Sequence, residues 1–268
     1  MSESRVLKVG LNGAGGRMGQ MLVSLIAKES DLKLVAALEE PGYPKLGQDA
    51  GLVAGVGELG VSLASEPIER PDVMIDFSLP AGTVKCVERC QEDDIPAVIG
   101  TTGLSDQQVK AIVSSSRRIP IVLAPNMSVG VNVLLAVVGQ VARLLGPSYD
   151  VEIVETHHRF KKDAPSGTAL KLAERIAEAL DRDMKKDLVF GRHGQVGART
   201  PREIGVHAVR AGDVVGDHVV TFATLGERIE LVHRAHSRET FARGALRAAR
   251  FVVGQPARLY TMDDVLGI

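Results

Sequence analysis

The run from Glu155 to Ala169 holds the densest group of reactive side chains, because two histidines and several cations follow an apolar segment. Ser166 then opens a helical pattern, whose first N–H groups lack carbonyl partners within the helix and suit a carboxylate or phosphate. A histidine supplies a proton near neutral pH, and a lysine neutralises an anion or donates a proton if its pKa is lowered. The run therefore predicts an anionic substrate beside a proton donor. A solvated basic turn before an ordinary helix cap is the plainer alternative.

A second motif, from Asn12 to Gly19, is rich in glycine and lies between an expected strand and an amphipathic helix. A dinucleotide pyrophosphate needs glycines for a tight turn and close backbone approach, and the N–H groups of a helix N-terminus. Counted from Gly13, Met18 stands where the common G-x-G-x-x-G pattern has its third glycine. Glu39 directly follows the next expected strand, about 20 residues beyond the cluster, where an acid binds a ribose hydroxyl. This context favours dinucleotide binding over a simple strand-to-helix turn.

Two more loops, Gly100-Thr101-Thr102-Gly103 and Ala124-Pro125-Asn126-Met127, each directly follow an expected strand. Loop-forming residues after strands are common, so these two motifs gain weight only from the glycine motif before them. Small residues and backbone amides at such positions would allow a nicotinamide ring to approach the edge of the sheet.

Elements that would position these motifs alternate along the first half of the chain, as in βαβ units with a parallel sheet. Right-handed crossovers would place the carboxyl ends of the strands along one edge, where ligands bind in open α/β sheets. The expected strands are 7–11, 32–38, 61–63, 73–77, 97–99 and 121–123, with helical patterns after Arg17 and at 84–90 and 109–113.

The second half of the chain has longer, more clearly alternating segments, which predict a mostly antiparallel or mixed sheet. We therefore expect an α/β protein in which a Rossmann-like, doubly wound parallel sheet is joined by a central α+β substrate domain. Its nucleotide domain would comprise residues 1–128 plus 241–268, and its substrate and oligomerisation domain residues 129–240. The expected strands are 151–155, 204–211, 218–225 and 228–235, and the expected helices are 131–145, 168–180 and 241–253.

Composition describes a neutral globular chain of 268 residues, with 45% hydrophobic residues and 33 acids against 32 Lys and Arg. The chain has no excess of positive charge, and aromatic residues make up only 3%. The composition therefore does not indicate a protein that binds nucleic acid. Neither a signal peptide at Met1–Lys8 nor a membrane span is expected. Cys86 and Cys90 are interpreted as reduced packing residues of a cytoplasmic protein, with a redox role as the alternative.

The other histidines do not form a recognisable metal-binding motif, since no cysteine or acid lies at a spacing typical of metal ligands. We expect polar sheet positions or subunit contacts, and no metal site, for His207, His218, His233 and His236.

Taken together, these motifs resemble the 4-hydroxy-tetrahydrodipicolinate reductase family of lysine and diaminopimelate biosynthesis. The most specific element is His-His-x-x-Lys-x-Asp-Ala-Pro-Ser-Gly-Thr-Ala, which begins at His157. The resemblance extends over nearly the whole chain, through the glycine motif, Gly100–Gly103, Asn126–Asn132 and Val209–Asp213.

The resemblance implies reduction of a small cyclic dicarboxylate by NADH or NADPH in a homotetramer joined through substrate-domain sheets. It implies His157 as the proton donor and Lys161 as partner acid or charge stabiliser. The implied substrate contacts are His158, Ser166, Gly167 and Thr168. The implied cofactor contacts are Gly13, Ala14, Gly15, Gly16, Arg17, Met18, Glu39, Gly100, Thr101, Thr102, Ala124, Pro125, Asn126 and Met127.

One position departs from the family pattern, because Glu40 follows Glu39 where members that favour the 2′-phosphate commonly carry arginine. Two carboxylates there should repel the phosphate of NADPH, so NADH is expected to be preferred, although Arg17 or Lys45 could partly compensate.

Two rivals remain: another two-domain NAD(P) oxidoreductase, such as a semialdehyde or amino-acid dehydrogenase, and a noncatalytic nucleotide sensor. An acylating semialdehyde enzyme needs a nucleophilic cysteine, and both cysteines fall on an expected helix. Retention of His157 and Lys161 argues against the sensor.

Overall fold

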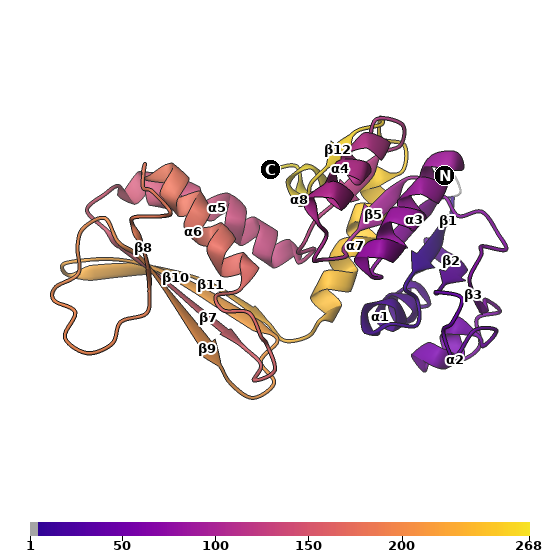
Figure 1. The fold of residues 1–268 in the computed structure, drawn as a ribbon, viewed down its shortest axis with the longest axis horizontal. Helices are drawn as coiled ribbons and strands as arrows, with labels where there is room; N and C mark the ends of the chain where they lie inside the picture. Colours follow the sequence, from indigo (N-terminus) through magenta and orange to yellow (C-terminus); the bar gives the residue numbers. More distant parts are fainter. Residues whose placement is uncertain (1–4) are drawn as a thin grey trace. The chain divides into compact units, whose positions relative to one another are not determined.

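The computed structural model describes residues 5–268, which form two compact units (Figure 1). One unit contains the chain up to Val129 together with Glu239–Ile268, and the other contains Gly130–Arg238. The first four residues of the expected polar lead at Met1–Lys8 lie outside the described residues. Across residues 5–268, no helix has the length and apolar character needed to cross a bilayer.

The first unit is built on a seven-stranded sheet in the order β12-β6-β5-β4-β1-β2-β3, in which every neighbouring pair is parallel. Its central strands are apolar on both faces because helices cover both faces. The expected parallel sheet is confirmed. The strands are β1 (Leu7–Asn12), β2 (Leu32–Leu38), β3 (Leu63–Ala64), β4 (Val73–Asp76), β5 (Ala97–Ile99), β6 (Ile121–Leu123) and β12 (Leu259–Tyr260).

Two groups of helices enclose this sheet, as a doubly wound fold requires (Figure 1). On one face lie α1 (Arg17–Ile26), α7 (Glu239–Val252) and α8 (Met262–Leu266), which bury their apolar residues with those of β1, β2 and β4. On the other face lie α3 (Pro80–Glu92) and α4 (Asp106–Ser115). The short helix α2 (Ala50–Ala54) follows β2 and packs beside α1.

The second unit contains a five-stranded sheet in the order β11-β10-β7-β9-β8. Pairs β11·β10 and β10·β7 are antiparallel, whereas β7·β9 and β9·β8 are parallel. The sheet is therefore mixed rather than mostly antiparallel, because α6 and the irregular segment 191–203 carry the chain between parallel strands. The strands are β7 (Asp150–His157), β8 (Leu188–Phe190), β9 (Ile204–Arg210), β10 (Gly216–Thr224) and β11 (Glu227–Ala235).

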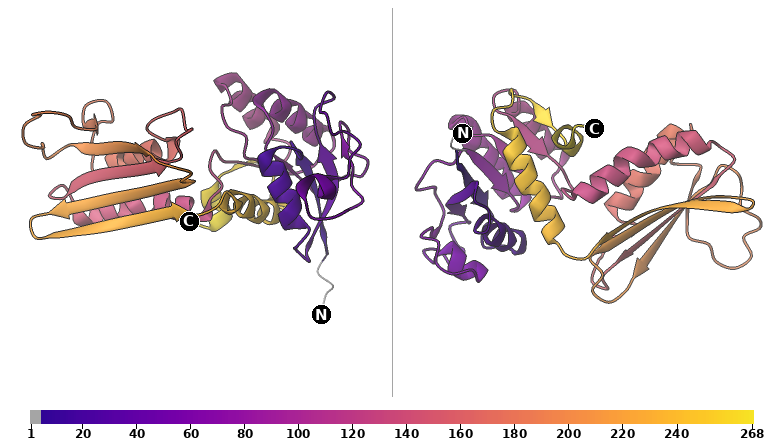
Figure 2. Two further views of the ribbon diagram at one scale, coloured as in Figure 1. Left: turned by 90° about the horizontal axis from the view of Figure 1, so that it is seen from below. Right: turned by 180° about the vertical axis from the view of Figure 1, so that it is seen from behind.

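One face of this mixed sheet is covered by α5 (Val129–Leu145) and α6 (Gly167–Ala179), which lie side by side in both figures (Figure 2). Buried side chains such as Val138 and Leu172 meet Ile153, Val206 and Phe222 of the strands. This packing fixes both the end of β7 and the start of α6, the two segments that carry the reactive motif.

Candidate active site and nucleotide-binding site

The glycine loop between β1 and α1 leaves no room for side chains. Gly13 has a φ of 80°, and a Cβ added at Gly19 would lie 2.1 Å from the Gly13 carbonyl oxygen and 2.5 Å from Ala14 Cα. Gly19 thus allows the close approach of helix and strand that the usual third glycine provides. Alignment of Gly13 and Gly15 with the G-x-G-x-x-G pattern placed Met18 at the third glycine and missed this role of Gly19. The three-residue spacing of Gly13, Gly16 and Gly19 would have found it.

Glu39 holds the glycine loop from the neighbouring strand. Its Oε1 accepts a hydrogen bond of 2.7 Å from the Gly15 N–H, which leaves Oε2 for another donor. The Tyr43 hydroxyl donates to the Gly15 carbonyl oxygen at 3.1 Å, and a Cβ at Gly15 would lie 2.4 Å from the Tyr43 ring. The acid expected to bind a ribose therefore lies directly beside the loop expected to bind a pyrophosphate.

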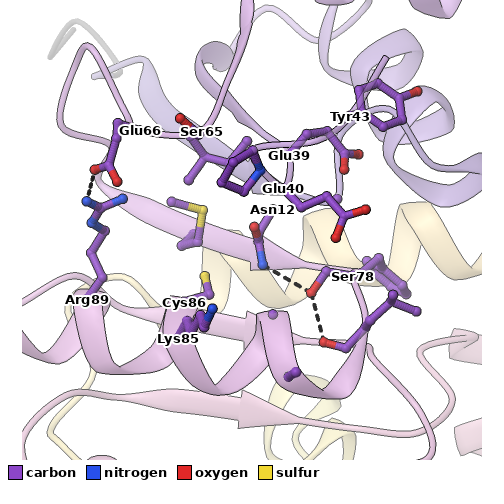
Figure 3. A pocket seen from close by; sticks show the side chains of 18 of the residues that line it. Asn12, Glu39, Glu40, Tyr43, Ser65, Glu66, Ser78, Lys85, Cys86 and Arg89 are labelled. Carbon is purple, nitrogen blue, oxygen red and sulfur yellow. Dashed lines mark hydrogen bonds and ion pairs between the residues drawn. The ribbon is translucent and has the colours of Figure 1, made fainter. Parts of the chain in front are cut away.

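A cleft of about 810 Å³ opens along this loop (Figure 3). Its walls come from the segments after β1, β2 and β4 and from α3. Glycines without room for a Cβ, an acid at the end of β2 and the N-terminus of α1 together fit a dinucleotide. Among the residues that line the cleft are Asn12, Gly13, Gly16, Glu39, Glu40 and Lys85, whereas Arg17 and Lys45 do not line it.

Asp76, at the end of β4, was not singled out from the sequence, yet it organises the edge of the sheet. The buried carboxylate accepts hydrogen bonds from Asn12 Nδ2 at 2.6 Å and from Ser78 Oγ at 2.6 Å. It also accepts from Thr83 Oγ1 at 2.6 Å and from Thr101 Oγ1 at 2.7 Å. An acid that ends an apolar strand directly before the ligand edge was the available signal. The carboxylate ties the loop after β5 to the loop after β1.

The two remaining nucleotide motifs, 100–102 and 124–127, follow β5 and β6 at the same edge of the sheet. The Thr101 side chain is used by Asp76, and Asn126 Oδ1 accepts the Ser128 N–H at 2.9 Å. Neither motif lines the cleft beside Glu39. Any ligand contact from these loops would therefore lie outside this cleft.

In the second unit, Glu155 is the centre of the reactive motif. Its side chain is fully buried, and Arg210 binds it with two hydrogen bonds of 2.8 and 2.9 Å. His157 Nδ1 lies 2.6 Å from Glu155 Oε2, and the Ser166 N–H donates to Oε1 at 3.0 Å. Burial opposes ionisation of Glu155, but the Arg210 and His157 contacts outweigh it and hold its pKa below the usual value. The carboxylate is therefore an anion within a closed set of donors.

The His157 ring has only 12% of its side-chain surface exposed. Burial lowers its pKa, with smaller contributions from Lys161 and Arg210, although the Glu155 carboxylate acts in the opposite direction. On the adjacent strand, a Cβ at Gly216 would lie 3.0 Å from His157 Nε2, so the glycine provides the space that this nitrogen occupies.

Lys161 and His158 follow His157 in the loop after β7. Lys161 Nζ donates to both carboxylate oxygens of Asp163, at 2.9 and 2.8 Å, and this contact lowers the pKa of Asp163. His158 Nδ1 is buried and has no hydrogen-bond partner within residues 5–268. Such an atom is costly to bury, and a ligand oxygen would satisfy it.

Ser166 caps helix α6, since its Oγ accepts the Ala169 N–H at 3.2 Å. Its own N–H donates to Glu155 Oε1 at 3.0 Å, and the substrate contact expected of Ser166 stays a prediction. The N–H group of Gly167 belongs to the first helical turn, where the helix itself supplies no carbonyl partner. Gly167 has no neighbouring atom within 4 Å of an added Cβ, which leaves space for a ligand.

The sequence predicts a polar sheet position or a subunit contact for His218, whereas the structure buries this residue, which is 3% exposed. Its Nε2 lies 3.2 Å from Ser166 Oγ, and its ring meets His157 edge-on with 5.3 Å between centroids. Burial, reinforced by the nearby His157 and His233, lowers the pKa of His218 to about 4. His218 is therefore a neutral neighbour of the site near pH 7.

The chain matches two family profiles, dihydrodipicolinate reductase N-terminus over residues 7–127 and C-terminus over residues 130–266. It is 49% identical to a 4-hydroxy-tetrahydrodipicolinate reductase of Syntrophotalea carbinolica over 98% of this chain and 100% of that protein. It is 50% identical to the reductase of Magnetococcus marinus over 97% of this chain and 98% of that protein.

Among solved structures, the fold is similar to a dipicolinate-bound dihydrodipicolinate reductase from Paenisporosarcina sp. TG-14. The TM-score is 0.73 at 24% identity, over 96% of this chain and 97% of the other. The match supports the fold expected for both units. The chain belongs to the 4-hydroxy-tetrahydrodipicolinate reductase family, NAD(P)H-dependent oxidoreductases of lysine and diaminopimelate biosynthesis.

Proposed function

We propose that His157 is the general acid of the reductase reaction and that Lys161 stabilises negative charge on the substrate. The observation that carries this proposal is the hydrogen bond of 2.6 Å between His157 Nδ1 and the buried Glu155 carboxylate. A histidine held in this way has one nitrogen fixed and the other available to a ligand. The bound nicotinamide cofactor supplies the hydride, and the protein supplies the proton for the developing carbanion or enamine.

The substrate proposed for the substrate domain, for which we propose residues 129–240, is the cyclic dicarboxylate 4-hydroxy-tetrahydrodipicolinate. Gly167 and Thr168 would hold one carboxylate at the start of α6, where the helix dipole favours an anion. His158 Nδ1, buried without a protein partner, would donate to a carboxylate oxygen. The dipicolinate bound by the Paenisporosarcina relative is a planar ligand of the same charge pattern.

We propose that NADH is preferred over NADPH in the nucleotide domain, residues 1–128 plus 241–268. Glu39 Oε2 would accept a ribose hydroxyl, while Glu40 lines the same cleft. A 2′-phosphate would meet both carboxylates, and like charges a few ångströms apart cost ~1 kcal/mol or more at a partly exposed site. Lys85 lines the same cleft, so NADPH is expected to bind more weakly rather than to be excluded.

We infer a homotetramer joined through the sheets of the second unit. The support is a set of large apolar side chains exposed on its strands and at one hairpin turn, whose burial in a subunit interface would be favourable. They are Val209, Leu225, Ile229 and Val232. We also infer that the enzyme acts in the cytoplasm, in keeping with the free, buried thiols of Cys86 and Cys90.

The same thiols weigh against an acylating dehydrogenase. Both belong to α3 and are buried against the sheet, and the contact with Cys90 together with burial raises the pKa of the Cys86 thiol well above its usual value. An activated nucleophile needs the opposite shift.

The direct test follows NADH and NADPH oxidation spectrophotometrically with freshly generated 4-hydroxy-tetrahydrodipicolinate. Turnover is expected with both cofactors in the wild type. His157→Gln should lose ~10²–10⁴-fold in kcat with little change in the Kd for NADH, because general acid catalysis contributes that much. A near-normal kcat in this variant would remove His157 from the mechanism.

A further inference from the structure

The buried Glu155 carboxylate contacts both parts of the proposed substrate site, the end of β7 at His157 and the start of α6 at Ser166. Glu155 Oε2 lies 2.6 Å from Nδ1 of His157, the proposed general acid. Glu155 Oε1 accepts a hydrogen bond of 3.0 Å from the N–H of Ser166, the residue before helix α6. Arg210 spans both oxygens from the neighbouring strand β9. Its second nitrogen also donates to the Asp163 carbonyl, which anchors the loop that carries Lys161.

We propose that Glu155 is a positioning residue for His157, held in place by Arg210, which fixes the proton on Nδ1 and presents Nε2 to the substrate. This inference rests on the proposed role of His157 as the general acid. Neither Glu155 nor Arg210 touches the substrate in this scheme.

The partners of Glu155 determine its charge. A carboxylate that binds an arginine with two hydrogen bonds is ionised and can only accept hydrogen bonds. The proton in the 2.6 Å contact therefore belongs to His157 Nδ1. In the neutral ring, Nε2 is then the bare nitrogen, and the proton acquired on charging resides there, where it can be transferred.

Charged groups on several elements act on His157. Glu155 on the same strand stabilises the charged ring, whereas Arg210 on β9 and Lys161 in the following loop oppose it. His218 on β10 is neutral near pH 7, and Lys161 is paired with Asp163. Because the Arg210 charge repels the imidazolium and the Glu155 charge attracts it, loss of either charge should shift the titration of His157 in the opposite direction to loss of the other, as long as Glu155 stays bound to His157.

Neighbouring groups also restrict the His157 ring sterically. The ring is confined by the His218 ring at a centroid distance of 5.3 Å and by the backbone of Gly216. With Nδ1 tied to Glu155, rotation of the ring would break a charge-assisted hydrogen bond, which is among the stronger interactions available in a buried site.

Glu155→Gln and Arg210→Gln test this arrangement through the pH profile of kcat/KM. Activity that needs protonated His157 falls as the pH rises through the pKa of that ring. In Glu155→Gln this fall should move to lower pH by about one unit or more, and kcat at pH 7.5 should drop at least ~10-fold. In Arg210→Gln the fall should move to higher pH. Equal profiles in both variants and the wild type would overturn the proposal.

A matched control exists on the same strand. Glu152 also pairs with arginine and histidine, through Arg192 at 2.8 Å and His207 at 2.7 Å, but does not contact His157. Glu152→Gln should alter stability while leaving the pH profile of kcat/KM unchanged. A shift in this variant equal to that of Glu155→Gln would show that the effect is a general consequence of lost charge.

A readout independent of turnover is the ¹⁵N NMR spectrum of the His157 ring above its pKa. The wild type should show the tautomer protonated on Nδ1, and Glu155→Gln should show a mixture of tautomers. If Glu155→Gln does not fold, Arg210→Gln and the wild-type tautomer still decide the question, since a wild-type ring protonated on Nε2 contradicts the proposal.

Failure of this inference differs from failure of the proposed acid. If His157→Gln keeps its activity, the acid assignment is wrong. If His157→Gln loses activity but Glu155→Gln retains the wild-type pH profile and tautomer, only the positioning role of Glu155 is wrong.

Discussion

The Glu39 carboxylate and the Gly15 amide are joined by a hydrogen bond of 2.7 Å, so the end of β2 and the glycine loop form one wall of the nucleotide cleft. Glu40 lines that cleft as well. The electrostatic character of this wall is consequently set by two adjacent acids, which makes cofactor choice accessible to single substitutions.

Glu40→Arg should shift the ratio of kcat/KM from NADH towards NADPH, because it replaces a repulsive charge with an attractive one. A tenfold change in the ratio corresponds to ~1.4 kcal/mol, and the shift should be largest at low salt. Glu58→Arg, at an exposed position outside the cleft, is the control for net charge. A wild type that already prefers NADPH strongly, or no change in Glu40→Arg, would contradict the expected contact with the ribose.

Gly19→Ala should destabilise the first unit by ~1–3 kcal/mol and raise the KM for NADH, because the new Cβ meets backbone atoms that cannot move aside cheaply. The added atom would lie 2.1 Å from the Gly13 carbonyl oxygen. Gly42→Ala, where no atom lies within 4 Å of the new Cβ, should leave both quantities close to the wild type. Thermal denaturation and steady-state kinetics check the pair, and equal behaviour would refute the packing role of Gly19.

Lys161→Ala should lower kcat and raise the KM for the dicarboxylate, provided that the ammonium group both neutralises the substrate and assists protonation. The neighbouring Lys162→Ala, which changes an exposed lysine, should affect neither value by more than a small factor. An unchanged KM in Lys161→Ala would restrict the lysine to the chemical step.

Pyridine-2,6-dicarboxylate should inhibit competitively with the substrate and not with the nucleotide. A planar dicarboxylate can accept from the N–H groups at the start of α6 and from His158, all of which belong to the second unit. Inhibition patterns at varied substrate and varied NADH distinguish the cases, and competition with NADH alone would move the anion site to the other unit.

The pH dependence of stability should report on His218. Its pKa falls from 6.5 to about 4 on folding, so the unfolded chain binds the proton more readily. The free energy of unfolding should therefore decrease as the pH falls from 7.5 to 5, by ~2 kcal/mol from this residue. His218→Gln should remove that part of the decrease, whereas the exposed His236→Gln should not. Denaturant titrations at the two pH values provide the comparison.

The sequence predicts secondary structure and site residues best where a single hydrophobic periodicity or a single motif determines them. The parallel strands of the first unit appear as short apolar runs between helical patterns, and β2, β5 and β6 begin and end at the expected residues. The parallel pairing of β7 with β9 was missed, because an irregular connection leaves no periodic pattern in the sequence.

The expected site residues were recognised from motifs, whereas their supporting partners come from distant parts of the chain. Asp76 and Arg210 lie on other strands than the motifs that they hold, and His218 reaches Ser166 only through strand pairing. Sequence spacing carries no information about such contacts. Their roles follow from the burial of charges, which must find partners wherever the fold provides them.

The first unit is assembled from two distant parts of the chain, up to Val129 and from Glu239 onward. During synthesis, the six strands β1 to β6 leave the ribosome long before α7 and β12, which cover one face and pair with β6. Since domains fold as units, the mixed sheet can form while the parallel sheet still lacks part of its core. The order of folding is therefore expected to reverse the order of synthesis, with the nucleotide-binding half completed last.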